Sequence, residues 1–287
     1  MNIFDHLYNQ DRFIEAKDDY SDAKTVIIGV PMDFTVSFRP GTRFGPKKIR
    51  EVSYGLENYS VYADDSLENR SFYDAGDVDI PFGNVKKSLD IIGDVAKEFL
   101  DDGKIPLFLG GEHLISFPII KKVVDKYPDL IIVHFDAHAD LRDSYFGEKL
   151  SHATVLRRIS EHVKDKHIYH FGIRSGIKEE FLYAKKHTHM YPIEVKAPFL
   201  KTLDDLRNRP IYITLDIDVV DPAFAPGTGT PEPGGCSSQE ILEVVSHFKG
   251  LNIVGFDLVE VSPANDLSER TSLLAAKILR ELLIGLG

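Results

Sequence analysis

Cysteine is almost missing from this chain: Cys236 is the only one among 287 residues, so no internal disulfide can form. Chains without disulfides are typical of a reducing compartment. We expect Cys236 to be a small, buried apolar residue and not a redox centre.

Long apolar stretches are also missing. No segment approaches the ~20 apolar residues of a membrane-spanning helix. The N-terminal sequence MNIFDHLYNQDRF lacks the basic start and apolar run of a secretory signal. We therefore expect a cytoplasmic protein that does not act at a membrane.

Basic residues are outnumbered by acidic ones, 34 against 45, which gives a formal net charge of −11. Proteins that bind nucleic acids generally carry a basic face, so this balance argues against that class. An acidic protein is consistent with a cationic substrate, although the charge could equally serve solubility alone.

What the sequence does contain is an alternation of short apolar runs with segments of helical spacing. The runs predict strands, and their continuous hydrophobicity is typical of a parallel sheet covered on both faces. They are Thr25–Val30, Ile105–Leu109, Leu130–Phe135, His167–Phe171, Ile211–Leu215 and Asn252–Phe256. The clearest predicted helices are Val85–Leu100, Ile115–Lys126, Ser151–Val163, Ser237–Phe248 and Ser268–Leu286.

This alternation predicts one α/β domain over residues 1–287, because no linker or repeat interrupts it. Ser237 stands three residues before Glu240, which predicts a capping box at a helix start. Two loops are rich in turn residues, 39–46 and 221–235, and long loops inside compact domains are more often functional than idle.

Side chains that bind metals follow one of the predicted strands. Asp136, His138 and Asp140 come at alternate positions directly after Leu130–Phe135. Because side chains two apart in an extended chain point the same way, these three can converge. His134, inside the strand, is expected to serve strand packing, off the face of the three.

The ends of three other predicted strands carry residues of the same kind. They are His113 in Gly-Gly-Glu-His, Asp216 with Asp218, and Glu260 in Asp-Leu-Val-Glu. Sites in open parallel sheets form beyond the carboxyl ends of the strands, so these groups should meet at one edge. An Asp-x-Asp pair alone is usually a solvated turn. Candidate ligands at the ends of several strands together are a much more specific indication of a metal site.

Four carboxylates and two imidazoles can share a dry cleft only with a counter-charge. Two divalent cations would balance the carboxylates, and a carboxylate–imidazole set without thiolates suits Mn²⁺ or a similar hard ion. Two ions about 3.5–4 Å apart would acidify a shared water to hydroxide, a strong nucleophile at neutral pH. The sequence therefore predicts a dinuclear metal centre.

These residues resemble the ureohydrolase family of arginases, agmatinases and their relatives, from about Thr25 to the C-terminus. The matching segments are GGEH (110–113), FDAHAD (135–140), SH (151–152), LDIDVVDP (215–222), GTGTP (227–231), PGG (233–235) and DLVEVSP (257–263). The resemblance implies the three-layer α/β/α arginase–deacetylase architecture and two Mn²⁺ per subunit. It also implies hydrolysis of a small cationic guanidino substrate to urea, and a homo-oligomer, either trimer or hexamer.

Residue by residue, the resemblance implies two overlapping sets of ligands. One ion would be held by His113, Asp136, Asp140 and Asp216, and the other by Asp136, His138, Asp216 and Asp218. Glu260 matches the carboxylate that binds the guanidinium, which suits paired hydrogen bonds. His152 matches a mobile histidine that passes a proton to the leaving amine, and Asp140 would also orient the hydroxide.

The resemblance says less about which residues bind the tail of the substrate, the part beyond its guanidino group. Arg142 stands where arginases carry an Asn that helps to hold the α-carboxylate of arginine. The run from Asp140 to Ala153 instead resembles bacterial agmatinases, which convert agmatine to putrescine and urea in polyamine synthesis. Phe146 departs from that pattern, because many agmatinases have an acidic residue there.

Several residues are candidates for contacts to the substrate tail. We expect Arg142 to face solvent or pair with Asp143; if it met a carboxylate instead, 4-guanidinobutyrate would be favoured. Agmatine, the substrate we favour, has an ammonium tail, which we expect to meet Asp143, Glu148 or a carbonyl. Arg174 and Ser175 follow another strand and should touch the tail from the active edge.

The sequence leaves three alternatives to the hydrolysis of agmatine. One is a guanidinobutyrase or another ureohydrolase with a different guanidino substrate. Another is a metal-dependent deacetylase of the same fold, which uses fewer ligands around one ion. The last is a non-catalytic relative, whose signature would be a lost ligand or a lost His152, and neither is lost.

Overall fold

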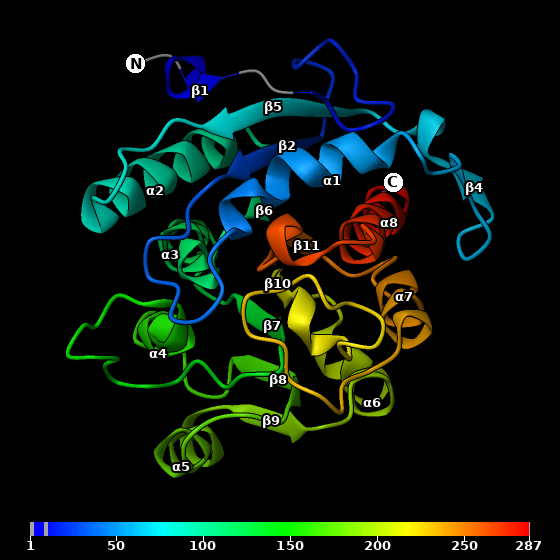
Figure 1. The fold of residues 1–287 in the computed structure, drawn as a ribbon. Helices are drawn as coiled ribbons and strands as arrows, with labels where there is room; N and C mark the ends of the chain where they lie inside the picture. Colours follow the sequence, from blue (N-terminus) through cyan, green and yellow to red (C-terminus); the bar gives the residue numbers. More distant parts are fainter. Residues whose placement is uncertain (1–2, 9–10, 287) are drawn as a thin grey trace.

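The computed structural model describes residues 3–8 and 11–286, and a nine-stranded sheet runs through this part of the chain (Figure 1). In spatial order its strands are β1 (Leu7–Tyr8), β5 (Phe72–Val78), β2 (Thr25–Val30), β6 (Ile105–Gly110), β11 (Ile253–Val259), β10 (Ile211–Asp216), β7 (Ile131–Phe135), β8 (Ile168–Ile173) and β9 (His189–Pro192). Neighbouring strands are parallel, apart from the antiparallel pair β1–β5. A separate small sheet pairs β3 (Tyr59–Ser60) with β4 (Asp65–Ser66).

Helices cover both faces of the large sheet (Figure 1). One face carries α1 (Gly45–Ser53), α6 (Lys196–Leu206), α7 (Ser238–Ser246) and α8 (Arg270–Leu286). The other carries α2 (Val85–Asp101), α3 (Ser116–Lys126), α4 (Val155–Ser160) and α5 (Lys178–His187). The predicted three-layer α/β/α architecture with a mainly parallel sheet is confirmed.

Each face has its own apolar core, and successive residues of a strand point into opposite cores. Ile27 of β2 packs in one core, and Ile28 packs in the other. Both faces of the strand are therefore buried, which is why its sequence is apolar without alternation.

The six predicted strands all form, with bounds that differ by no more than three residues at either end. Four predicted helices also form close to their expected bounds, and Ser237 and Glu240 make the predicted capping box. The segment Ser151–Val163 differs: a 3-10 turn (His152–Thr154) precedes a short α4 that ends at Ser160.

Other 3-10 turns complete the chain and mark several strand ends. They are Ile3–His6, Thr42–Phe44, Leu67–Asn69, His113–Ile115, Ile217–Val219 and Pro263–Asn265. No helix in the described ranges is long and apolar enough to cross a membrane.

Candidate active site

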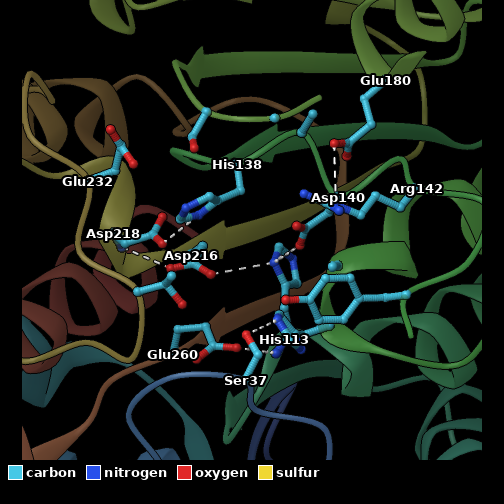
Figure 2. A pocket seen from close by; sticks show the side chains of 17 residues that line it. Ser37, His113, His138, Asp140, Arg142, Glu180, Asp216, Asp218, Glu232 and Glu260 are labelled. Atoms are coloured by element: carbon cyan, nitrogen blue, oxygen red, sulfur yellow. Dashed lines mark hydrogen bonds and ion pairs between the residues drawn. The ribbon is translucent and has the colours of Figure 1, made fainter. Parts of the chain in front are cut away.

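The central strands β6, β11, β10 and β7 end at one edge of the sheet, where a cavity of about 300 Å³ opens. Parallel strands deliver the residues that follow them to the same edge. The predicted metal ligands at three of these strand ends and Glu260 at the fourth therefore lie together, as Figure 2 shows for the residues that line the cavity.

His113 is surrounded by carboxylates. Its Nδ1 lies 3.1 Å from Asp136 Oδ2, 3.3 Å from Asp140 Oδ2 and 3.5 Å from Asp216 Oδ2. The four residues come from the ends of β6, β7 and β10, so the sheet itself sets their separation.

The other ring nitrogen of His113 fixes its tautomer. Nε2 lies 2.9 Å from Thr214 Oγ1, and the Thr214 hydroxyl donates to Asp257 at 2.6 Å. Because that hydroxyl has one proton, its oxygen must accept from His113 Nε2–H. In the neutral ring, Nδ1 therefore carries a lone pair that faces the three carboxylates.

This arrangement fits a metal cation. His113 Nδ1 is buried and makes no hydrogen bond within the described residues. A lone pair that faces three carboxylate oxygens is repulsive unless a positive charge lies among them. Imidazole and carboxylate are the ligand types that a hard divalent ion accepts.

A second cluster lies beside the first. His138 Nδ1 is 3.0 Å from Asp218 Oδ2 and 3.6 Å from Asp136 Oδ1. Asp136 therefore turns one oxygen toward His113 and the other toward His138, as would suit a carboxylate shared by two ions. Asp216 turns Oδ2 toward His113, while its Oδ1 accepts a hydrogen bond from the Asp218 amide at 2.8 Å.

The pKa values of two aspartates in the metal-free protein are consistent with their assignment as candidate metal ligands. Burial, and then the charge of Asp136, raise the pKa of Asp140 to about 7. Burial and the neighbouring carboxylates Asp218 and Asp136 raise the pKa of Asp216 well above its usual range. Bound cations would remove this cost of holding buried negative charges together.

His134 is the one residue of this strand whose expected place was wrong. His134 and Asp136 are two positions apart, so by strand alternation their side chains lie on the same face of the sheet. His134 Nε2 is 2.9 Å from Asp136 Oδ2, and its Nδ1 is 2.8 Å from His170 Nδ1. Both ring nitrogens are thus engaged, which places His134 to orient the carboxylate of Asp136, a candidate metal ligand.

Glu260 lies at the end of β11, below the aspartates in Figure 2. Its Oε1 accepts a hydrogen bond from the His113 amide at 2.8 Å, and burial raises its pKa to about 8. Glu260 and Asp140 both have left-handed backbone, with φ of 64° and 52°. Non-glycine residues in this strained conformation concentrate at functional sites, which strengthens both assignments.

His152 lies in the wall of the same cavity. Its Nε2 is 3.3 Å from Ser37 Oγ, and its amide donates to Thr35 Oγ1 at 3.0 Å. The Thr35 hydroxyl in turn donates to Glu112, a buried carboxylate. Burial lowers the pKa of His152 to about 4, so the imidazole is neutral at pH 7. The sequence offered no signal for Thr35, Ser37 or Glu112 as neighbours of His152.

Arg142 reaches the cavity but does not make its expected contact. Its Nε lies 3.6 Å from Glu180 Oε2, and its guanidinium lies over Tyr145, 5.1 Å from the ring centroid. Asp143 instead binds Arg158 at 3.0 Å. The expected Arg142–Asp143 pair is wrong because α5 brings Glu180 closer.

Of the other residues considered for the substrate tail, the structure places some at the cavity and others away from it. Ser175 lines the cavity. Arg174 does not; its guanidinium donates to backbone carbonyls, including that of Asp218 at 2.6 Å and that of Glu232 at 2.7 Å. Phe146 is 89% exposed and, like Glu148, borders a neighbouring cleft. Cys236 is buried, as expected, and burial raises its pKa to about 12.

Comparisons with known proteins agree with this geometry. Residues 23–285 match the model of the Arginase family. An agmatinase from Bacillus subtilis (strain 168) is 50% identical over 285 residues, which cover 98% of each chain. A guanidinobutyrase from Pseudomonas aeruginosa is 37% identical, with 89% of this chain and 84% of that protein covered. The crystal structure of agmatine ureohydrolase of Thermoplasma volcanium superposes with a TM-score of 0.87 at 33% identity, covering 97% and 94% of the two chains.

Proposed function

The chain belongs to the arginase family, and we propose that it hydrolyses agmatine to putrescine and urea at a centre of two Mn²⁺ ions. Its class, a hydrolase acting on guanidino compounds, follows from that membership. The same membership sets aside a deacetylase or a non-catalytic protein. The observation that carries the metal part is the bare, buried Nδ1 of His113 among three carboxylate oxygens.

We assign the two ions to the ligand sets that the residues suggest. One ion would be bound by His113 and Asp140, and the other by His138 and Asp218. Asp136 and Asp216 would bind both ions. When bound, the ions would supply a water that is acidic enough to act as a nucleophile near neutral pH. The lack of a thiolate ligand supports Mn²⁺ over softer metals.

Glu260 would bind the guanidinium. A planar cation is well matched by a carboxylate that makes paired, charge-assisted hydrogen bonds. The His113 amide holds Oε1 in place and leaves Oε2 for the substrate. The positive charge of the substrate would lower the raised pKa of Glu260 and ionise it on binding.

His152 would carry the proton that the departing amine needs. The Thr35 hydroxyl donates its hydrogen bond to Glu112 and can only accept from Nδ1, 3.5 Å away, which favours the tautomer with the proton on Nδ1; Ser151 Oγ, 3.3 Å from Nδ1, can also accept in that tautomer. Nε2 is then the bare nitrogen, on the side of Ser37 and the cavity. A neutral imidazole in this tautomer takes up a proton at Nε2 and can pass it on.

A second candidate substrate is 4-guanidinobutyrate. The observation in its favour is that Arg142 lines the cavity and could meet a carboxylate. Against it, the guanidinium of Arg142 already faces Glu180. A tail carboxylate would have to compete with that neighbour.

We also propose that the protein is a cytoplasmic homo-oligomer. Around one cleft the aromatic side chains of Phe44 and Phe82 are 56% and 82% exposed, with Tyr8 beside them. Apolar patches of this kind commonly mark contacts between subunits. Sedimentation velocity would give the number of subunits.

The test of the function is urea release by Mn²⁺-loaded protein with agmatine, L-arginine, 4-guanidinobutyrate and guanidine side by side. Agmatine should have the highest kcat/KM. A preference for 4-guanidinobutyrate would move the chain to the second candidate. No urea from any of the four, with metal bound, would contradict the proposed substrate but not the metal centre.

A further inference from the structure

Three charged side chains line the cavity in addition to the candidate ligands and Glu260. They are Arg142, Glu180 and Glu232. These residues surround the space left for the substrate tail, because Glu260 and the candidate metal ligands line the part of the cavity that would hold the guanidinium. Their net charge therefore decides which tail is bound.

Arg142 and Glu180 balance each other. Their side chains lie on the same side of the cavity in Figure 2, with Nε 3.6 Å from Oε2. Glu180 is only 2% exposed, and its two oxygens also accept hydrogen bonds from the amides of Leu141 and Ile177, each at 2.8 Å. This carboxylate is thus fully engaged, and the pair adds no net charge to the tail region.

Glu232 is different. Figure 2 shows it on the Asp218 side of the cavity, opposite Arg142 and Glu180. Its carboxylate makes no hydrogen bond or ion pair with any residue that the structure describes. It is the one lining carboxylate, among the described residues, that is neither a candidate ligand nor satisfied by the protein.

The backbone holds Glu232 in place independently of its side chain. Its carbonyl accepts from Arg174 Nε at 3.2 Å and from Nη2 at 2.7 Å. Pro231 and Pro233 flank it and restrict the local backbone. Just beyond, Asp221 accepts from the amides of Gly234 and Gly235. A carboxylate on a rigid loop loses little entropy when it binds a ligand.

We propose that Glu232 binds the terminal ammonium of the substrate and so selects an amine tail over a carboxylate tail. The unpaired charge attracts a cation and repels a carboxylate across the cavity. Arg174 is then a positioning residue, because it holds the Glu232 backbone without touching the substrate. This inference deepens the proposed function and rests on it.

The experiment compares agmatine with 1-butylguanidine, which has the same four-carbon spacer but no ammonium, in wild type and Glu232→Gln. A lost charge-assisted hydrogen bond should raise KM for agmatine roughly 10- to 100-fold. kcat for agmatine, and both constants for 1-butylguanidine, should change little. Glu232→Asp should restore part of the agmatine affinity.

Glu68→Gln is the matched control, because Glu68 is exposed, lies outside this cavity, and its carboxylate makes no hydrogen bond or ion pair with the residues that the structure describes. It removes the same charge from the protein and should leave both substrates unaffected. Unchanged kinetics with 1-butylguanidine also show that Glu232→Gln is folded and holds metal.

Two outcomes would overturn the inference while agmatine hydrolysis stands. One is a wild-type KM for agmatine in Glu232→Gln. The other is an equal rise in KM for both substrates, which would indicate a role in the shape of the loop. If the wild type itself released urea from 4-guanidinobutyrate and not from agmatine, the proposed function would fail first and the inference with it.

Discussion

His134→Leu should weaken the binding of Mn²⁺ without removing any ligand. His134 Nε2 lies 2.9 Å from Asp136 Oδ2, so in its absence this oxygen of the shared carboxylate has no donor to orient it. Leucine has a similar size, so the loss is a hydrogen bond and not a large cavity. The side chain is fully buried, and water has no access to replace the lost donor.

The size of the effect follows from the kind of bond that is lost. A hydrogen bond to a charged group contributes about 1.5–3 kcal/mol, which corresponds to roughly 10- to 100-fold in affinity. Removing the partner that orients a metal ligand typically lowers metal affinity by the same 10- to 100-fold. His170 also loses its partner on Nδ1, so the metal-free variant should be less stable by about 1–3 kcal/mol.

The assay is competition between the protein and a chromophoric chelator for Mn²⁺, after the metal has been removed by dialysis. His189→Leu is the control, because His189 lies on the edge strand β9 and stacks on Tyr169 away from the cavity. A folded His134→Leu protein with wild-type affinity for Mn²⁺ would refute the orienting role. Failure of the wild type to bind any divalent metal would refute the metal centre itself.

The other predictions concern the ligands, the proton carrier and the response to pH. Asp136→Asn and Asp216→Asn should each lose metal and nearly all urea release, since each carboxylate would serve two ions; normal turnover in either, by colorimetric urea assay, would exclude the dinuclear assignment. His152→Ala should keep its metal, measured by elemental analysis, but turn over roughly 10²- to 10⁴-fold more slowly; an unchanged kcat would remove His152 from the reaction. Burial lowers the pKa of His152 from 6.5 to about 4 and that of His170 well below 6.5. The unfolded chain therefore binds protons at these sites that the folded chain does not, so the two histidines lower the free energy of unfolding as pH drops below 6.5, by up to about 3 kcal/mol for His152. In metal-free protein the raised pKa values of Asp140, Asp216 and Glu260 act in the opposite sense, so the test compares two proteins. Urea denaturation at pH 7.5 and 5 should show that the lower pH is less unfavourable for His170→Asn than for the wild type; an identical pH dependence would contradict a neutral, buried His170.

The central strands could be predicted because burial on both faces leaves a plain signature. β2, β6, β7 and β10 are almost wholly buried and mostly apolar, and polar residues of the site stand at the ends of β6, β7 and β10. Two rules then place the candidate ligands: strand alternation and the shared edge of parallel strands. The same alternation, applied to His134, would have placed it beside Asp136.

β5 and α1 could not be recognised, because a buried ion network gives both a polar sequence. Arg50 of α1 is fully buried, with Nε 2.8 Å from Asp74 Oδ2. It also binds Asp77, which like Asp74 belongs to β5. A strand that contains two aspartates and a glycine, and a helix rich in charge, look like surface segments. Only the tertiary pairing makes their burial possible.

The tail region shows the same limit in the functional site itself. The sequence favours a pair between Arg142 and its neighbour Asp143, whereas the structure pairs Arg142 with Glu180 on α5. Once that pair is known, Arg142 no longer presents an uncompensated positive charge to the cavity. The carboxylate that remains, Glu232, sits between two prolines in a loop without periodicity. Selectivity for the tail thus depends on which charges the fold leaves unpaired, and a chain can keep every candidate ligand while a change in one such pairing alters the preferred substrate.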